Sequence, residues 1–364
     1  MNILHTESST GWGGQENRTL NELMTLRERG LAPMLACPPQ ARLGTRAREA
    51  GFEVHDIPMR GALDLPALLA LRRLMQRRCI EIVNTHSGRD TQLAGLAAKT
   101  LGSHRPRVVR TRHLALPISS PFTYVRLVDQ VVTVSRFVGD YLASAGVPAG
   151  RITTVPTGID LSRYRIDGPG TLRAELGLPA AALLIGTVAI LRRKKGHAEL
   201  LEAVPAVLAK FPAAHFVFAG DGPQHENLAR RIGELGLGGN VHLLGLRHDV
   251  VNVLASLDLF VLPTHQEALG TAFIEAGAMG LPVVASRVDG VPEVVQEGIT
   301  GLLVAVKDST ALAAAICALL ADPARRQAMG EAARAWIATR FSREAMVDGM
   351  LAVYAKVLAA EKSR

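Results

Sequence analysis

Short apolar runs alternate along the chain with longer stretches in which apolar residues return every three to four positions. The runs typical of buried strands lie at residues 1–5, 33–37, 53–57, 80–85, 107–111, 130–134 and 152–155, and again at 183–190, 215–219, 241–244, 257–262, 282–286 and 302–304. Helical periodicity fills the intervals, as at residues 15–29 and 65–78. This alternation predicts an α/β fold in which helices cover parallel sheets.

The alternation pauses at residues 155–160, where the segment V-P-T-G-I-D has turn residues and no periodicity. The chain has 364 residues, and a single core stops growing near about 250–300 residues. We therefore predict two doubly wound domains, at residues 1–158 and 159–340, with a helix at 341–364 that crosses back to the first. Ligands of such sheets bind beyond the carboxyl ends of the strands, so the loops after the strands are where chemistry is expected.

Composition adds little to this picture. The chain is 48% hydrophobic and 20% charged, as soluble proteins are. No apolar run approaches the roughly 18–20 residues of a membrane span, and no basic segment followed by an apolar one opens the chain. We expect a cytoplasmic protein whose three scattered cysteines, Cys37, Cys79 and Cys317, are free thiols.

Charge is distributed unevenly. Residues 1–160 hold 20 Lys and Arg against 13 Asp and Glu, whereas the remainder holds 21 against 20. The motifs and aromatic residues of a nucleic-acid binder are missing, with aromatics at 4%. The basic half is therefore expected to face an acceptor linked to phosphate or an anionic lipid surface.

The helix predicted at residues 65–78 is the candidate for membrane contact. It carries Arg72, Arg73, Arg77 and Arg78 beside leucines. It could lie peripherally on the inner face of an anionic membrane. The alternative is an ordinary surface helix that packs its leucines on the sheet.

A glycine-rich loop follows the first predicted strand, with the sequence G-W-G-G-Q-E at residues 11–16. Glycines let the backbone approach a ligand, and amides at the start of a helix attract phosphate. The spacing is not G-x-G-x-x-G, so a nicotinamide dinucleotide site is poorly supported. The loop predicts a phosphate or sugar contact, the alternative being a plain turn.

Two glutamates follow the strand predicted at residues 257–262. A helix is expected to begin near Gly270 and to end at Gly280, which places Glu267 in the loop and Glu275 on the helix. Even on one helix, eight residues would separate them by about 12 Å, beyond the roughly 5–9.5 Å of a glycosidase carboxylate pair. They suit a grip on two ends of a long ligand, with amides near Leu269 and Thr271 facing a diphosphate.

Cations and histidines follow other strands. Arg192, Arg193, Lys194 and Lys195 precede Gly196, which is typical of a diphosphate clamp or, alternatively, of a solvated charge run. His113 ends the segment R-T-R-H, and His86 has the same placement after an earlier strand. No acidic pair suited to Mg²⁺ follows a strand, so no metal and no cofactor is expected. A G-x-S-x-G elbow is also missing, which disfavours an α/β-hydrolase.

Together these motifs resemble the retaining glycosyltransferases of family 4, which have the GT-B fold of two Rossmann-like domains facing across a cleft. The matching motifs are Glu267-x7-Glu275, Lys195-Gly196, Gly220-Asp221-Gly222-Pro223, Gly290-Val291-Pro292-Glu293, Gly298-x-x-Gly301 and Gly13-Gly14-x-Glu16. The resemblance covers nearly the whole chain, and the ordered set is more specific than any one motif.

The resemblance implies that Glu275 bonds the ribose of the donor nucleotide, Glu267 contacts the donor sugar and Lys195 binds the diphosphate. His113 would touch the donor sugar and assist the reaction, which makes His113, Glu267 and Lys195 the candidate catalytic residues. The donor would be a UDP-, GDP- or ADP-sugar, bound without a metal.

Backbone segments complete the implied site. The diphosphate would meet Ala268, Leu269, Gly270 and Thr271, the base would meet Leu246 and Arg247, and Gly220 would also belong to the donor side. Gly13 and Gly14 would approach the donor from the first domain. Candidate acceptor-side residues are Glu16, His86 and Ser135.

Two positions depart from the family pattern. The arginine often found five residues before the lysine of K-G is replaced by Ile190, and we expect Arg192 or Arg193 to take its role. The glycine often found after the first glutamate is Ala268, which permits less backbone freedom.

The function implied is transfer of a sugar, with retention, from a nucleotide diphosphate sugar to a hydroxyl of a saccharide or lipid-linked acceptor, such as an envelope glycan or lipopolysaccharide. We expect charge stabilisation of the leaving diphosphate rather than a nucleophilic Glu267. The alternatives are a nucleotide-sugar epimerase of the same fold and a non-catalytic nucleotide-sugar binding protein. The sequence leaves the base, the sugar, the acceptor and the oligomeric state open.

Overall fold

A computed structural model describes residues 1–118, 121–165, 168 and 170–362. The chain divides into two compact units, Met1–Ile159 with Ser342–Arg364, and Asp160–Phe341. The sequence pattern placed this division after residue 158 and gave residues 341–364 to a returning helix.

The first unit is built on a parallel sheet with the strand order β3-β2-β1-β4-β5-β6-β7. Its strands are β1 (Ile3–Thr6), β2 (Met34–Cys37), β3 (Val54–Asp56), β4 (Ile82–Thr85), β5 (Arg107–Arg112), β6 (Gln130–Thr133) and β7 (Ile152–Thr154). Its α-helices are α1 (Gly14–Glu28), α2 (Arg42–Glu49), α3 (Leu65–Arg77), α4 (Gly88–Lys99), α5 (Arg136–Ser144) and α14 (Arg343–Lys362), and short helical turns lie at η1 (Gly102–His104), η2 (Thr123–Leu127) and η3 (Ala149–Arg151).

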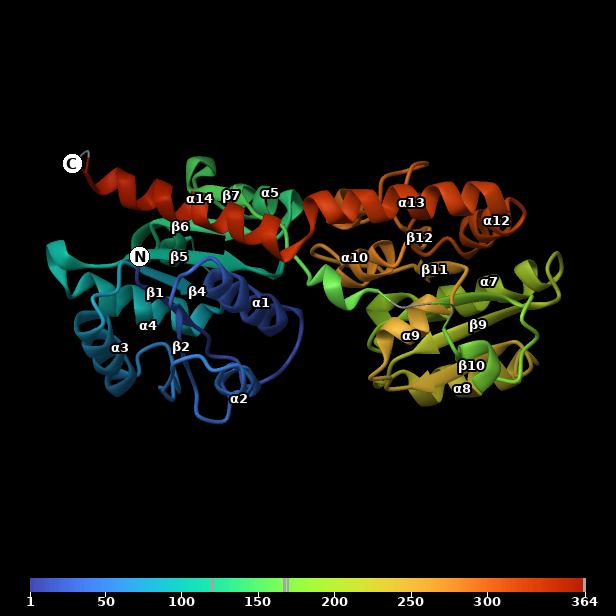
Figure 1. The fold of residues 1–364 in the computed structure, drawn as a ribbon, viewed down its shortest axis with the longest axis horizontal. Helices are drawn as coiled ribbons and strands as arrows, with labels where there is room; N and C mark the ends of the chain where they lie inside the picture. Colours follow the sequence, from blue (N-terminus) through green and yellow to red (C-terminus); the bar gives the residue numbers. More distant parts are fainter. Residues whose placement is uncertain (119–120, 166–167, 169, 363–364) are drawn as a thin grey trace. The chain divides into compact units, whose positions relative to one another are not determined.

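Apolar residues point to both faces of this sheet because side chains alternate along a strand. Leu4 and Val83 pack with helices α3 and α4 on one face. Their neighbours Ile3 and Ile82 pack on the other face with α1 and α14. Helix α14, the red ribbon beside α1 in Figure 1, thus completes a layer of the first unit although it comes from the end of the chain.

The second unit is a parallel sheet with the strand order β10-β9-β8-β11-β12-β13. Its strands are β8 (Leu183–Val188), β9 (Ala214–Ala219), β10 (Val241–Gly245), β11 (Leu259–Leu262), β12 (Val283–Ser286) and β13 (Gly301–Val304). Its helices are η4 (Leu161–Arg163), α6 (Leu172–Glu175), η5 (Arg193–Lys195), α7 (His197–Leu208), α8 (His225–Glu234), α9 (Val250–Ala255), α10 (Thr271–Ala278), α11 (Val291–Val294), α12 (Ser309–Leu320) and α13 (Pro323–Arg340). Helices α7, α8 and α12 enclose one core with Phe216 and Phe218, and α10 packs on α13.

The predicted fold class is confirmed. Every strand predicted from the sequence is present, with ends that move by two residues or fewer, and the helices predicted at residues 15–29 and 65–78 are α1 and α3. The three cysteines are free, as predicted, and Cys37 and Cys317 are buried. Within the described residues, none of the helices combines the length and apolar character that a membrane crossing requires.

Candidate active site

The loops after β8 and β11 are joined backbone to backbone at the carboxyl edge of the second sheet. The carbonyl of Lys194 accepts hydrogen bonds from the His265 amide at 2.7 Å and the Thr264 hydroxyl at 3.0 Å. Gly196 turns the chain at φ 74°, and a Cβ there would lie 1.9 Å from the Pro263 oxygen. Only glycine fits this crossing, which brings Lys195 beside the second loop.

The first glutamate lies in this loop and meets the lysine. Lys195 Nζ donates a hydrogen bond to Glu267 Oε2, and both side chains are largely buried. The loop after β12 also contacts Glu267. The Glu267 amide donates a hydrogen bond to Asp289 Oδ2 at 2.9 Å, and the Glu267 carbonyl accepts one from the Gly290 amide at 3.0 Å. The lysine and glutamate of the two motifs therefore form one rigid unit.

Helix α10 begins directly after this loop, as predicted. Gly270 stands before its first residue with φ 97°, and Leu269 is buried. The start of a helix has amides without intrahelical partners and a positive dipole end, which suit an anion. Ala268, Leu269, Gly270 and Thr271 thus lie where a diphosphate cradle is expected.

The second glutamate lies on α10 and contacts a tyrosine that the sequence did not indicate. Tyr164, just after η4, donates a hydrogen bond to the Glu275 carboxylate. Burial raises the pKa of Glu275, while the hydrogen bond from Tyr164 and the charge of Arg163 act in the opposite direction. Burial, followed by the charge of Glu275 and the hydrogen bond to it, raises the pKa of Tyr164.

The predicted base contacts follow β10. Leu246 is 67% exposed, so its apolar side chain is accessible to a base. Arg247 forms ion pairs with Asp249 at 2.5 Å and Glu175 at 3.0 Å. Gly220 has a packing role, because a Cβ there would lie 1.9 Å from the Ala189 oxygen.

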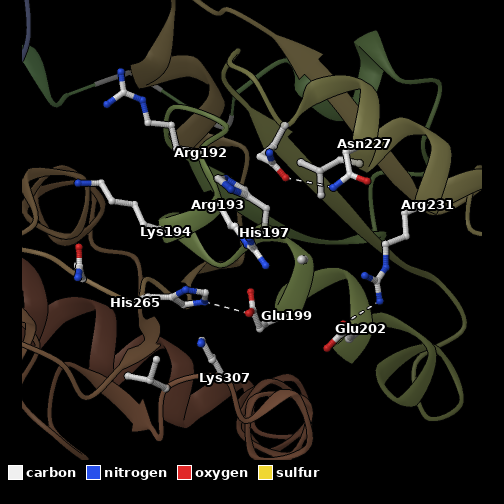
Figure 2. Close-up of a pocket in the computed structure, with 15 residues that line it drawn as sticks. Arg192, Arg193, Lys194, His197, Glu199, Glu202, Asn227, Arg231, His265 and Lys307 are labelled. Atoms are coloured by element: carbon white, nitrogen blue, oxygen red, sulfur yellow. Dashed lines mark hydrogen bonds and ion pairs between the residues drawn. The ribbon is translucent and has the colours of Figure 1, made fainter.

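The remaining cations of the K-G segment line a cavity of about 1010 Å³ (Figure 2). Its lining includes Arg192, Arg193 and Lys194 but not Lys195 or Glu267. In the same cavity, as Figure 2 shows, His265 pairs with Glu199 at 2.9 Å and Arg231 with Glu202 at 2.7 Å. The proposed substitution of Arg192 or Arg193 for the family arginine stays a prediction.

In the first unit, the glycine loop after β1 leads into α1, as the pattern predicted. Gly13 and Gly14 are exposed, and a Cβ at Gly14 would meet nothing within 4 Å. Packing therefore does not require glycine at Gly14, which leaves its backbone open to a ligand. Glu16, two residues after Gly14, is buried, with 6% exposure.

His86 and His113 end neighbouring strands and meet. His113 Nε2 lies 3.2 Å from His86 Nδ1, and His86 Nε2 lies 3.0 Å from Nδ1 of His5 on β1. Burial is the main cause that lowers the pKa of all three rings, which are therefore neutral at pH 7. His5 was missed by sequence reasoning because a histidine in a buried strand carries no local signal.

Ser135 has a structural task at the same edge. Its hydroxyl accepts a hydrogen bond from the Val138 amide at 3.2 Å and so caps α5. Among the described residues, no group of three or more His, Cys, Asp or Glu side chains is placed to hold a metal ion.

Two family models match the chain. The model for "Glycosyltransferase Family 4" matches residues 12–163, and the model for "Glycosyl transferases group 1" matches residues 170–336. A GDP-mannose-dependent alpha-(1-6)-phosphatidylinositol monomannoside mannosyltransferase of Mycobacterium tuberculosis is 31% identical over 318 residues, which are 81% of this chain and 81% of that relative. The lipopolysaccharide core biosynthesis glycosyltransferase LpsE of Rhizobium meliloti is 33% identical over 183 residues, 50% of this chain and 53% of LpsE.

The fold is shared with solved structures. The structure of Anabaena HepE in complex with UDP superposes with a TM-score of 0.88 at 21% identity, covering 98% of this chain and 100% of HepE. A glycosyltransferase from Rickettsia africae also gives a TM-score of 0.88, at 22% identity and with 98% of both chains covered. The chain therefore belongs to the group 1 glycosyltransferases of family 4 and has their GT-B fold.

Proposed function

We propose that this glycosyltransferase takes its sugar from a nucleoside diphosphate sugar and transfers it to a hydroxyl with retention at the anomeric carbon. The observation that carries the proposal is the Lys195–Glu267 pair just before α10, with Glu275 on α10 itself. Lys195 and the amides of α10 suit the diphosphate, Glu275 the ribose and Glu267 the sugar. The names of the mannosyltransferase relatives and the UDP of the Anabaena structure support this donor class.

Catalysis in this proposal depends on charge stabilisation of the leaving diphosphate. Lys195 and the positive end of α10 supply that charge, so no metal is required. The leaving phosphate oxygen accepts the proton of the acceptor hydroxyl, which attacks from the same face. Glu267 already forms an ion pair with Lys195. In this proposal it binds the sugar and does not act as a nucleophile.

The proposed acceptor is a saccharide or lipid-linked glycan of the cell envelope. Relatives named for phosphatidylinositol mannoside and lipopolysaccharide core synthesis support this class.

Leu63, Leu65 and Leu69 around the start of α3 are 85%, 61% and 39% exposed, close in sequence to Arg73. This patch supports peripheral contact with an anionic membrane. Sedimentation with anionic vesicles, but not neutral ones, is expected, and equal sedimentation with both would contradict it.

The epimerase and the non-catalytic binding protein are not favoured, because the relatives are glycosyltransferases. Donor consumption separates the three. A transferase consumes donor in proportion to acceptor, an epimerase converts donor without acceptor, and a binding protein leaves donor unchanged.

The donor is tested first by thermal shift with UDP, GDP, ADP and their sugars, since a ligand present at about 100 times its Kd stabilises the folded state by about 2.7 kcal/mol. The anomeric configuration of the product, read by NMR, then tests retention; an inverted product contradicts it.

Arg192→Ala and Arg193→Ala test whether these arginines bind the diphosphate. At least one should raise the donor KM or lower kcat, and an unchanged rate in both removes these arginines from the site.

A further inference from the structure

Three histidines form a continuous chain inside the first unit, from His113 through His86 to His5. Their ring centroids are 5.4 and 5.3 Å apart, and none is more than 8% exposed. The two N···N contacts, at 3.2 and 3.0 Å, each require one ring to donate a proton and the next to accept it. The protons along the chain are therefore ordered together.

A buried glutamate stands at the inner end. Glu22 Oε1 lies 3.9 Å from His5 Nε2, and it accepts hydrogen bonds from the Tyr354 hydroxyl at 2.7 Å and the Asn84 amide at 3.2 Å. Among the described residues, neither His5 Nε2 nor Glu22 Oε2 has a hydrogen-bond partner. A carboxylate in this position favours a proton on the facing nitrogen.

Burial is the largest cause that lowers the pKa of the three rings, and nearby cations act in the same direction. Arg18 on α1 faces all three rings, Arg110 on β5 faces the outer two, and Arg112 faces His113. A neutral imidazole carries one proton, on one of its two nitrogens. The three rings thus carry three N–H groups. Two of them lie in the N···N contacts, and the third is at one end of the chain, on His5 Nε2 or on His113 Nδ1.

Two proton arrangements satisfy both contacts. In the first, every N–H points inward, and the last points from His5 Nε2 toward Glu22. In the second, every N–H points outward, and His5 directs a lone pair at the carboxylate. A ring lone pair that faces a carboxylate in a buried site is unfavourable, so the first arrangement is preferred. We propose that Glu22, through His5 and His86, holds His113 in the Nε2–H tautomer and makes His113 Nδ1 a hydrogen-bond acceptor.

The consequence for the ligand rests on the proposed function. An unprotonated Nδ1 accepts a hydrogen bond from a hydroxyl and cannot donate one to a phosphate oxygen. A ligand group at His113 Nδ1 is therefore a hydrogen-bond donor, such as a hydroxyl, and not a phosphate oxygen. Glu22 acts as a positioning residue, because it reaches His113 only through two other rings.

The tautomer is measured directly in the substrate-free protein by nitrogen-15 NMR of labelled histidine side chains. The His113 signals are identified by their loss in His113→Asn. We expect the proton on Nε2 and a pyridine-like Nδ1. A proton on Nδ1 in the wild-type protein overturns the proposal, whatever any variant does.

Glu22→Gln tests the cause. The variant keeps the shape but loses the charge that favours a proton on His5 Nε2, so the two proton arrangements come closer in energy. We expect His113 to carry its proton partly on Nδ1 and kcat to fall, with the donor KM within about twofold. An unmoved proton, or a moved proton with unchanged kcat, contradicts the proposal.

Tyr354→Phe is the matched control, because it removes one hydrogen bond from the same carboxylate and keeps the charge. Its His113 tautomer should equal that of the wild type, and a reversed tautomer would attribute the effect to local packing and overturn the proposal. A wild-type protein with the expected spectrum and no transferase activity would contradict the proposed function alone.

Discussion

Both units have a parallel sheet covered by helices, yet the loops at the carboxyl ends of the two sheets are held together differently. In the second unit the edge is made by backbone crossings, where Gly196 lies against Pro263 and Gly290 against Ala268, with room for no Cβ. In the first unit it is made by buried polar side chains, with His86 between two other histidines. Backbone contacts at the edge of the second sheet fix the position of the proposed diphosphate site. The histidines at the edge of the first sheet can instead change their protonation.

The largest expected effect comes from the charge at the backbone edge. Lys195→Ala removes the cation from Glu267 and from the proposed diphosphate, so kcat/KM should fall by about 10²–10³. Steady-state kinetics with the identified donor measures this. Lys194→Ala, on the same turn but outside the ion pair, is the control and should fall by less than about threefold. Equal losses of kcat/KM in the two variants would mean that the positive charge of the segment matters and not the Lys195–Glu267 ion pair.

Glycine substitution should separate the two edges by stability. Gly196→Ala places a Cβ against the Pro263 oxygen in a left-handed conformation and should destabilise the second unit by about 3 kcal/mol. Gly14→Ala meets nothing and should stay within about 0.5 kcal/mol.

Each unit contains one of the chain's two tryptophans, Trp12 and Trp336. Urea unfolding followed by fluorescence in Trp12→Phe therefore reports the second unit, and in Trp336→Phe the first. Equal stability losses for the two glycine variants would erase the distinction drawn between the edges.

Acid should act on the first unit through its histidines. The pKa values of His5, His86 and His113 lie below the ordinary value of 6.5, so the unfolded chain binds protons first as the pH falls through 6.5. Each group removes about 1.4 kcal/mol of stability per pH unit in that window. Burial, and then Asp90, raise the pKa of Glu7 to about 8, which gives an opposite slope between pH 4.5 and 8.

The stability of the first unit should therefore fall as the pH drops below 6.5, because three rings outnumber Glu7 and Asp90, whose pKa burial also raises. The substitution His86→Gln should reduce this slope by about 1.4 kcal/mol per pH unit, measured by urea unfolding in the Trp336→Phe background. The slope of the second unit should not change with His86→Gln. A slope in the first unit that is unchanged by the substitution would show that the buried rings are not what titrates.

The smallest expected effect concerns the tyrosine on Glu275. Tyr164→Phe removes the hydrogen bond that a ribose must replace, worth about 1 kcal/mol. The donor nucleotide should therefore bind about fivefold more tightly, by calorimetry. Tyr141→Phe in the first unit is the control and should bind as the wild type does. Weaker binding to Tyr164→Phe would instead make Tyr164 a ligand of the donor.

The sequence by itself determined the parallel sheets and the candidate donor residues. Apolar residues at successive positions demand burial on both faces, and Gly270 and Gly280 marked the ends of α10 because turns require their backbone freedom. Lys195, Glu267 and Glu275 could be named because their motifs are short and local.

Only the tertiary structure decided which of these residues meet. Lys195 and Glu267 are 72 positions apart, and Glu22 and Tyr354 are 332 apart, so no periodicity connects them. The contact of Tyr164 with Glu275 depends on how the segment after residue 160 packs on α10. Periodicity reports the burial of each segment, whereas a contact between distant segments depends on how whole layers stack.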